Sequence, residues 1–147
     1  MKKIFPPTHF YTYLLISVLL HFLLPMKQIV HPPLIYLGWL LIITGSALNI
    51  WADQLFKKQK TTVKPNKKPT RLIDYGPFRI SRNPMYLGMA VILFGVGIFL
   101  GTITAFTGAV LFIIAMEIYF IPDEEKSMHE AFGSEFENYK AKVRRWI

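Results

Sequence analysis

The feature that most constrains this fold is a run of 37 residues, 85–121, that carries a single charge, Glu117. As one helix the run would be roughly 55 Å long, which is nearly twice the thickness of the hydrocarbon core of a bilayer. Gly97, Gly101 and Thr102 lie near its middle and can form a tight turn. The run therefore predicts two membrane-spanning helices joined as a hairpin.

Two further apolar stretches precede this run. Residues 34–56 are polar only near their end, and residues 10–24 are bracketed by prolines. The second stretch resembles the core of a signal peptide, but no small-residue cleavage site follows it, which favours a retained helix. The chain has 147 residues, 52% of them hydrophobic, and its length is that of one domain. We therefore expect an all-α, integral membrane protein with one domain (1–147) and four transmembrane helices, at approximately 8–25, 34–55, 84–100 and 103–121.

Basic residues are distributed unevenly around these helices. Two precede the first span, one lies between the first and second, nine lie between the second and third, and five follow the fourth. Because Lys and Arg are enriched on the cytoplasmic side, both termini and the loop 57–82 should face the cytoplasm, with 57–68 as a solvated linker. The net charge of +8 then reflects topology and contact with anionic membrane lipids. Nucleic-acid binding is not expected, since the charges form no separate soluble domain.

A polar motif precedes the third span. Asn83 is a good helix N-cap and Pro84 a good first helical residue, so a helix should begin here. Its first N–H groups, beside Arg82, are then suited to bind the carboxylate of an amino-acid-like ligand. Nearby aromatic rings could attract a cation such as a sulfonium; they are Tyr75, Phe78 and Tyr86. The ordinary alternative is that a capped, positively flanked helix start is common in membrane proteins.

Acidic residues mark the far end of the hairpin. Glu117 lies near the membrane boundary, where acids usually face a polar cavity or a partner. Glu124 follows seven residues later, so the two should share a face if the helix continues through Pro122. Acids at a helix C-terminus oppose the macrodipole, so a cation should offset them. That cation is either a ligand or, in the ordinary alternative, Arg79, Arg82 or a loop lysine.

The C-terminal segment 123–147 ends in a predicted amphipathic helix. Ser134 and Glu137 form a Ser-x-x-Glu sequence, which is typical of a capping box and follows Gly133. The helix would lie along the cytoplasmic interface, with basic residues around an apolar stripe of Phe136, Tyr139, Val143 and Trp146. Two roles fit it equally: a cap over the loop, or a plain membrane anchor.

Four motifs follow one another in a specific order: Gly76-Pro77-Phe78, Arg82-Asn83-Pro84-Met85-Tyr86, Glu124-Glu125, and Phe132-Gly133-Ser134-Glu135-Phe136-Glu137-Asn138-Tyr139. This order resembles the isoprenylcysteine carboxyl methyltransferase family and its phospholipid-methylating relatives. The similarity extends from about Thr61 to the C-terminus, and 61–65 looks like the bacterial members. The first two spans are similar only in hydropathy.

The resemblance implies an integral membrane methyltransferase, in the bacterial inner membrane, that uses S-adenosylmethionine without a Rossmann domain. The chain indeed has no Gly-x-Gly-x-x-Gly motif. Glu124 would bind the ammonium group of the cofactor, and Arg82 with the helix start would hold its carboxylate. The implied cofactor-binding residues are Leu72, Ile73, Phe78, Arg82, Asn83, Pro84, Tyr86 and Glu124. The reaction needs alignment and exclusion of water more than an elaborate base.

Two positions depart from the family pattern. Asn83 stands where many members have histidine, a replacement associated with bacterial members. Phe120 stands where the prenylcysteine enzymes carry a substrate-side arginine, and an apolar ring cannot neutralise a substrate carboxylate. We therefore expect a lipophilic or amphiphilic small molecule with an amine, thiol or other nucleophile as the acceptor. Phe120 would lie on the substrate side, and Glu117 or Glu125 would be the catalytic base.

Two other functions are compatible with these features. A non-enzymatic membrane scaffold or lipid-binding protein could keep the fold without turnover, and measurable cofactor affinity would distinguish it from an enzyme. A transporter fragment is disfavoured by the lack of internal repeats. No metal is expected, and the absence of cysteines excludes disulfides, thiolate metal sites and cysteine nucleophiles.

Overall fold

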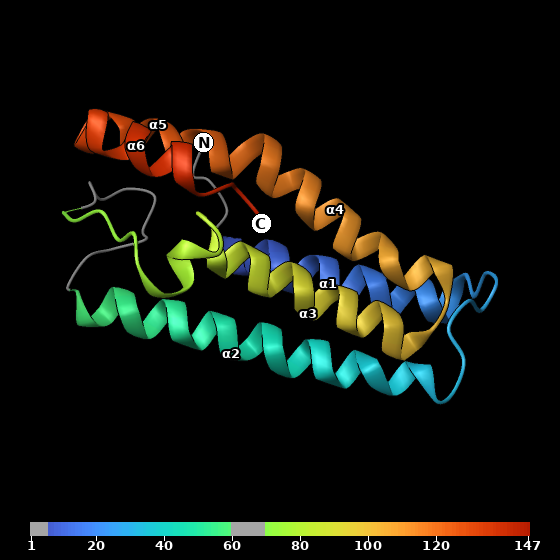
Figure 1. Ribbon diagram of the computed structural model, residues 1–147. Coiled ribbons are helices and arrows are strands. Elements are labelled where there is room, and N and C mark those ends of the chain that lie inside the picture. Colours follow the sequence, from blue (N-terminus) through green and yellow to red (C-terminus); the bar gives the residue numbers. More distant parts are fainter. Residues whose placement is uncertain (1–5, 60–69) are drawn as a thin grey trace.

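The structure, a computed structural model, describes residues 6–59 and 70–147. Throughout this part of the chain the secondary structure is helical, apart from one isolated bridge between Gln28 and Thr102. The expected all-α class is therefore confirmed for the described residues. Figure 1 shows the main helices, which are α1 (Pro6–Leu23), α2 (Leu37–Lys58), α3 (Pro84–Leu100), α4 (Thr107–Ala115), α5 (Ile121–Phe132) and α6 (Ser134–Lys142).

Two helical stretches, Leu34–Lys58 and Ile103–Phe132, are long and apolar enough to cross a membrane. Helix α3 is also apolar but shorter, at 17 residues. Side chains on the outer side of α2, among them Leu40 and Ile43, are exposed and apolar, as expected where a helix contacts lipid. Two spans are thus supported by length and composition, and the count of four stays a prediction.

Helices α4 and α5 form one continuous helix through a π-helical turn, Met116–Phe120. The helix thus continues through Pro122, which was the condition for Glu117 and Glu124 to share a face. A proline inside an α-helix removes a hydrogen bond and clashes with the carbonyl of the preceding turn. The wider π turn, a feature that often occurs at functional sites, precedes this proline and contains both Glu117 and Phe120.

Helices α2 and α3 lie side by side with their backbones in close contact (Figure 1). A carbon added at Gly38 would lie 2.4 Å from the carbonyl oxygen of Gly95, and one added at Gly45 would lie 2.6 Å from that of Gly88. Small residues let helix backbones approach in this way. The contact fixes the start of α3 against α2.

The turn between α3 and α4 forms where the glycines predicted it. Gly101 ends α3 with a φ of +78°, a left-handed conformation that suits glycine. Its carbonyl oxygen accepts hydrogen bonds from the backbone N–H groups of Ile29 and Val30, at 2.8 and 3.1 Å. The connection between α1 and α2 is thereby joined to this turn.

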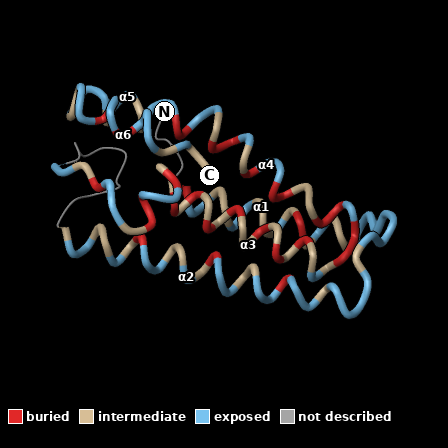
Figure 2. The backbone as a smooth tube through the Cα atoms, in the orientation of Figure 1, coloured by how far each residue is buried: buried red, intermediate tan, exposed pale blue. Residues whose placement is uncertain are grey.

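The main core lies where α1, α3 and α4 meet. Leu93, Phe112 and Met116 are fully buried there, and Figure 2 shows buried positions along the facing sides of α3 and α4. A second cluster joins the end of α2 to α6 and to the segment 72–78. The candidate site lies at this second end of the bundle.

Candidate functional site

The first contact of the site joins α3 to α5. Tyr86, in the first turn of α3, donates its hydroxyl to Glu124 Oε1 at 2.5 Å. The two residues are 38 positions apart in the chain, and Tyr86 is only 7% exposed. Two predicted cofactor residues are thus brought together at the mouth of the helical hairpin.

Glu125 joins three segments through two arginines. Its Oε1 lies 3.1 Å from Arg82 Nη2, and it accepts hydrogen bonds from Arg145 Nε at 3.0 Å and Nη2 at 2.8 Å. The Arg82 side chain is 9% exposed and that of Glu125 is 14% exposed. Arg82, one of the cations considered for offsetting Glu117 and Glu124, therefore pairs with neighbouring Glu125.

Glu117, in the π turn, pairs with the last residues of the chain. Arg145 Nη1 donates to Glu117 Oε1, and the indole of Trp146 donates to Oε2 at 3.0 Å. Hydrogen bonds to Glu125 and to Glu117 raise the pKa of Arg145 above its ordinary value, so the guanidinium stays charged. The intramembrane acid therefore has partners that the sequence interpretation did not name.

Residues 143–147, which we call the C-terminal strap, also bind the start of α3 through their backbone. The carbonyl oxygen of Arg145 accepts hydrogen bonds from Ser81 Oγ at 2.9 Å and Asn83 Nδ2 at 3.1 Å. The carbonyl oxygen of Arg144 accepts one from the backbone N–H of Arg82 at 2.9 Å. The strap thus fastens the 81–83 segment to the helix that carries the glutamates.

The predicted start of α3 is confirmed, with Asn83 at the N-cap and Pro84 as the first helical residue, whereas the predicted capping box of α6 is wrong. Asn83 does occupy the N-cap position of α3, but its side chain makes no capping hydrogen bond and bonds to the strap instead. At α6 the N-cap is Gly133, with a φ of +50°, and Ser134 is already helical. The Glu137 carboxylate pairs with His129 Nδ1 at 3.0 Å and does not close a capping box. Asn83 and Glu137, the side chains that would form the two caps, bond instead to Arg145 and His129.

Helix α6 covers the segment that precedes α3. Phe136 and Tyr139 are buried against Ile73 and Phe78, and the Tyr139 hydroxyl donates to the Phe78 carbonyl oxygen at 2.7 Å. Burial raises the pKa of the Tyr139 phenol well above its ordinary value, which keeps the hydroxyl protonated as a donor. Of the two roles that fitted this helix, the structure favours the cap.

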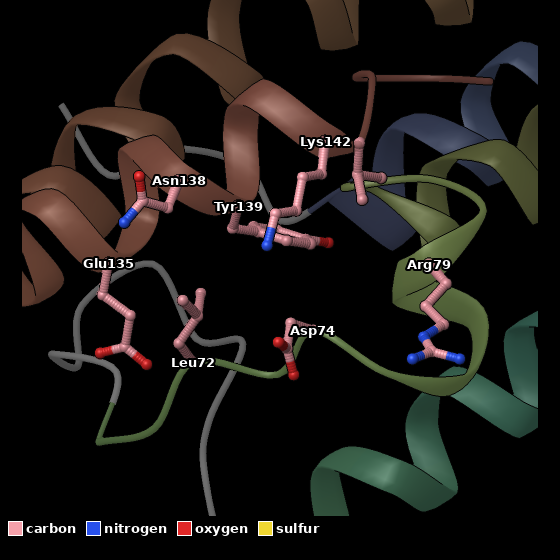
Figure 3. A pocket seen from close by; sticks show the side chains of 8 residues that line it. Leu72, Asp74, Arg79, Glu135, Asn138, Tyr139 and Lys142 are labelled. Carbon is pink, nitrogen blue, oxygen red and sulfur yellow. The ribbon is translucent and has the colours of Figure 1, made fainter.

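A cavity of about 370 Å³ lies between α6 and the segment 72–79. Figure 3 shows the α6 side chains on one side of it and those of Leu72, Asp74 and Arg79 on the other. Its lining residues are Leu72, Asp74, Arg79, Glu135, Asn138, Tyr139, Lys142 and Val143. Since Val143 begins the strap, the cavity is adjacent to the site around Arg82.

Arg82 retains binding capacity. Its Nε and Nη1 atoms are buried and have no hydrogen-bond partner among residues 6–59 and 70–147, although Nη2 pairs with Glu125. Unpaired donors of a buried guanidinium are costly and are normally satisfied by an anion or water. The arginine is therefore suited to bind an anionic ligand group.

The chain is similar to known membrane methyltransferases over most of its length. The family model for phospholipid methyltransferases matches residues 34–135, which is more than half of the chain. The chain belongs to the phospholipid methyltransferase family. It is also 38% identical over 63 residues to an uncharacterized protein of Haemophilus influenzae; this stretch is 43% of the present chain and the whole of that protein.

In this member of the phospholipid methyltransferase family, the predicted site residues lie in two groups. Arg82, Asn83, Pro84, Tyr86 and Glu124 meet at the start of α3. The other cofactor candidates, Leu72, Ile73 and Phe78, lie in the segment under α6. Phe120 is 5% exposed in the main core, with its ring 5.1 Å from that of His9 on α1.

The sequence interpretation missed the strap. Arg145 and Trp146 lie outside the range matched by the phospholipid methyltransferase family model. The sequence interpretation places them on the basic and apolar faces of the last helix. In the structure this helix, α6, ends earlier, at Lys142. The sequence signal that could have indicated the strap is the adjacent pair Arg145 and Trp146, a cation and an indole donor after the end of the helix. Ser81, directly before the Arg-Asn-Pro motif, is the other residue overlooked.

Proposed function

We propose that this protein is an S-adenosylmethionine-dependent membrane methyltransferase that acts on a lipophilic or amphiphilic small molecule. Family membership supports the methyltransferase class. The observation that carries the rest is the placement of Glu124 and a buried, incompletely paired Arg82 on two sides of the start of α3. A carboxylate and a guanidinium are the complementary pair for an amino acid's ammonium and carboxylate.

The residues present fit the cofactor. Arg82 Nε and Nη1 can donate to its carboxylate, and Glu124, oriented by Tyr86, can accept from its ammonium group. The cavity under α6 has the size of a small-molecule site, which is roughly 300–1,000 Å³ in most proteins, and could take the nucleoside. When bound, S-adenosylmethionine supplies a methyl group: the acceptor's lone pair forms the new bond, and the electrons of the broken bond stay on sulfur. The chain's part is to align the acceptor and exclude water.

The acceptor could approach from the bilayer. A hollow of about 400 Å³ lies between α1, α2 and α3, and among its mostly apolar walls are Phe10, Ile50 and Met89. Met85 also lines it and directly precedes Tyr86, so the hollow reaches the start of α3. These features support an acceptor with an apolar chain.

Glu117 and Glu125 stay proposed as proton acceptors. Both accept hydrogen bonds from Arg145. A carboxylate oxygen that accepts from Arg145 becomes available to a proton only when that contact loosens. We therefore propose that the proton of a neutral amine acceptor leaves through whichever glutamate loosens its contact with Arg145 when the acceptor binds.

Purified protein in nanodiscs should bind S-adenosylmethionine and its demethylated product when titrated by calorimetry. Cells given a labelled methyl donor should then contain a labelled lipophilic product that depends on the protein. An absence of binding at millimolar cofactor would contradict the proposed function and favour a non-enzymatic scaffold.

A prediction on topology follows from the positions of the basic residues. The ends of α2 and α5 lie with the starts of α1 and α3 at one end of the bundle (Figure 1). We propose that this end faces the cytoplasm of a bacterial inner membrane and that four helices span the bilayer. On the cysteine-free background, Lys58→Cys should be labelled only from the cytoplasmic side and Lys27→Cys only from outside. The reverse pattern would overturn the assignment.

A second prediction concerns the acceptor. We expect amine-headed and neutral amphiphiles to be methylated in preference to a farnesylated cysteine mimic, by roughly tenfold or more, because a carboxylate left without a partner is costly to bury. Competition with labelled cofactor measures this preference. Because Phe120 is buried, an arginine introduced there would be an unpaired buried charge, so Phe120→Leu is the better control and should keep the preference. Preferential methylation of the cysteine carboxylate would contradict the prediction.

A further inference from the structure

Arg145 is fixed from two sides. Its side chain makes three hydrogen bonds, two to Glu125 and one to Glu117, while its carbonyl oxygen accepts from Ser81 and Asn83. Each of these contacts joins the strap to an element of the candidate site. Arg145 is therefore held against both glutamates by its side chain and against the start of α3 by its backbone.

This arginine lies among the same charges that would hold the cofactor. Glu125 bridges Arg145 and Arg82, and it directly follows Glu124 in the first turns of α5. The Arg145 side chain is 36% exposed, so its charge is only partly screened by water. In a cofactor whose ammonium group is bound by Glu124, only three carbons separate that group from the sulfonium, so the sulfonium charge would also interact with Arg145 and the glutamates.

We propose that Arg145 sets how strongly the site prefers the sulfonium cofactor over its thioether product, an inference that rests on the proposed function. The two molecules differ by one methyl group and one positive charge. By neutralising Glu117 and Glu125, Arg145 lowers the affinity for the charged form relative to the neutral one. An interaction that held the sulfonium alone would oppose the reaction, since positive charge leaves sulfur in the transition state. Arg145 is thus a positioning residue that acts through two carboxylates.

The ratio of two affinities tests this inference. We would measure the dissociation constants of S-adenosylmethionine and S-adenosylhomocysteine by calorimetry in nanodiscs, for the wild type and for Arg145→Gln. Removing this one positive charge should shift the ratio about three- to tenfold toward the sulfonium form. A general loss of structure would lower both affinities and leave their ratio unchanged.

Four further variants separate charge from structure. Arg145→Lys keeps the charge and should keep the wild-type ratio, and so should the double variant Arg145→Gln/Glu117→Gln, which restores the net charge. Glu117→Gln alone should shift the ratio the opposite way, which tests the inference even if Arg145→Gln does not fold. Lys126→Gln is the matched control, because Lys126 is an exposed cation next to Glu125 and its loss should leave the ratio unchanged.

Each outcome is decisive. A ratio that stays constant in both Arg145→Gln and Glu117→Gln would overturn the inference while leaving the proposed function intact. An equal shift in Lys126→Gln would also overturn it, since the effect would then belong to the general charge of the surface. If the wild type binds neither compound, the proposed function itself is wrong.

Discussion

Replacing Glu124 by glutamine should weaken the binding of S-adenosylmethionine by roughly ten- to a hundredfold, because a hydrogen bond between charged groups contributes about 1.5–3 kcal/mol. Glutamine keeps the size of the side chain and can still accept the Tyr86 hydroxyl, so the loss reports the missing negative charge. Calorimetry in nanodiscs measures it directly.

Two other variants control this experiment. Tyr86→Phe removes the hydroxyl that orients Glu124 and keeps the aromatic ring, so we expect a loss of only several-fold. Glu130→Gln removes an exposed charge from the same helix and should bind as the wild type does. Wild-type affinity in Glu124→Gln would show that the ammonium group is bound elsewhere.

The second large effect is expected far from the charges, where α2 contacts α3. A leucine at Gly45 would drive its first carbon to within 2.6 Å of the Gly88 carbonyl oxygen and 3.1 Å of the Ile92 nitrogen. These are backbone atoms, so the two helices must separate. Overpacking of this kind should lower the melting temperature by about 5 °C or more. Cofactor binding should weaken with it, because α3 carries Tyr86 at its start.

Ala47→Leu is the matched control, since Ala47 is an exposed residue on the same helix. Thermal unfolding in nanodiscs, followed by circular dichroism, should show little change for this variant. If Gly45→Leu were as stable as Ala47→Leu, the close contact between α2 and α3 would not exist in the membrane.

The sequence predicted those features that depend on local pattern. The apolar run with a glycine turn indicated the α3–α4 hairpin, and the Arg-Asn-Pro motif located the start of α3. Both follow from hydropathy and from the backbone preferences of Gly and Pro, which act over a few residues. The close contact of Gly38 and Gly45 with α3 became apparent only in the structure.

The remaining features depend on contacts that are distant in the chain. Arg145 reaches Glu117 because the backbone becomes extended at Val143, after α6 ends. Helical periodicity carries no information about such a change of direction. The same reason explains Asn83, whose local preference for capping is outweighed by a hydrogen bond to a residue 62 positions away.

The π turn before Pro122 acts as a built-in insertion of one residue. An α-helix advances by about 100° per residue, so a single extra residue rotates everything after it by that angle relative to everything before. Deleting Ile118 should convert the turn to ordinary α-helix and swing Glu124 away from Tyr86, while the buried face of α4 keeps its place. The direction in which Glu124 points therefore depends on the number of residues in this turn as much as on the identity of the side chain.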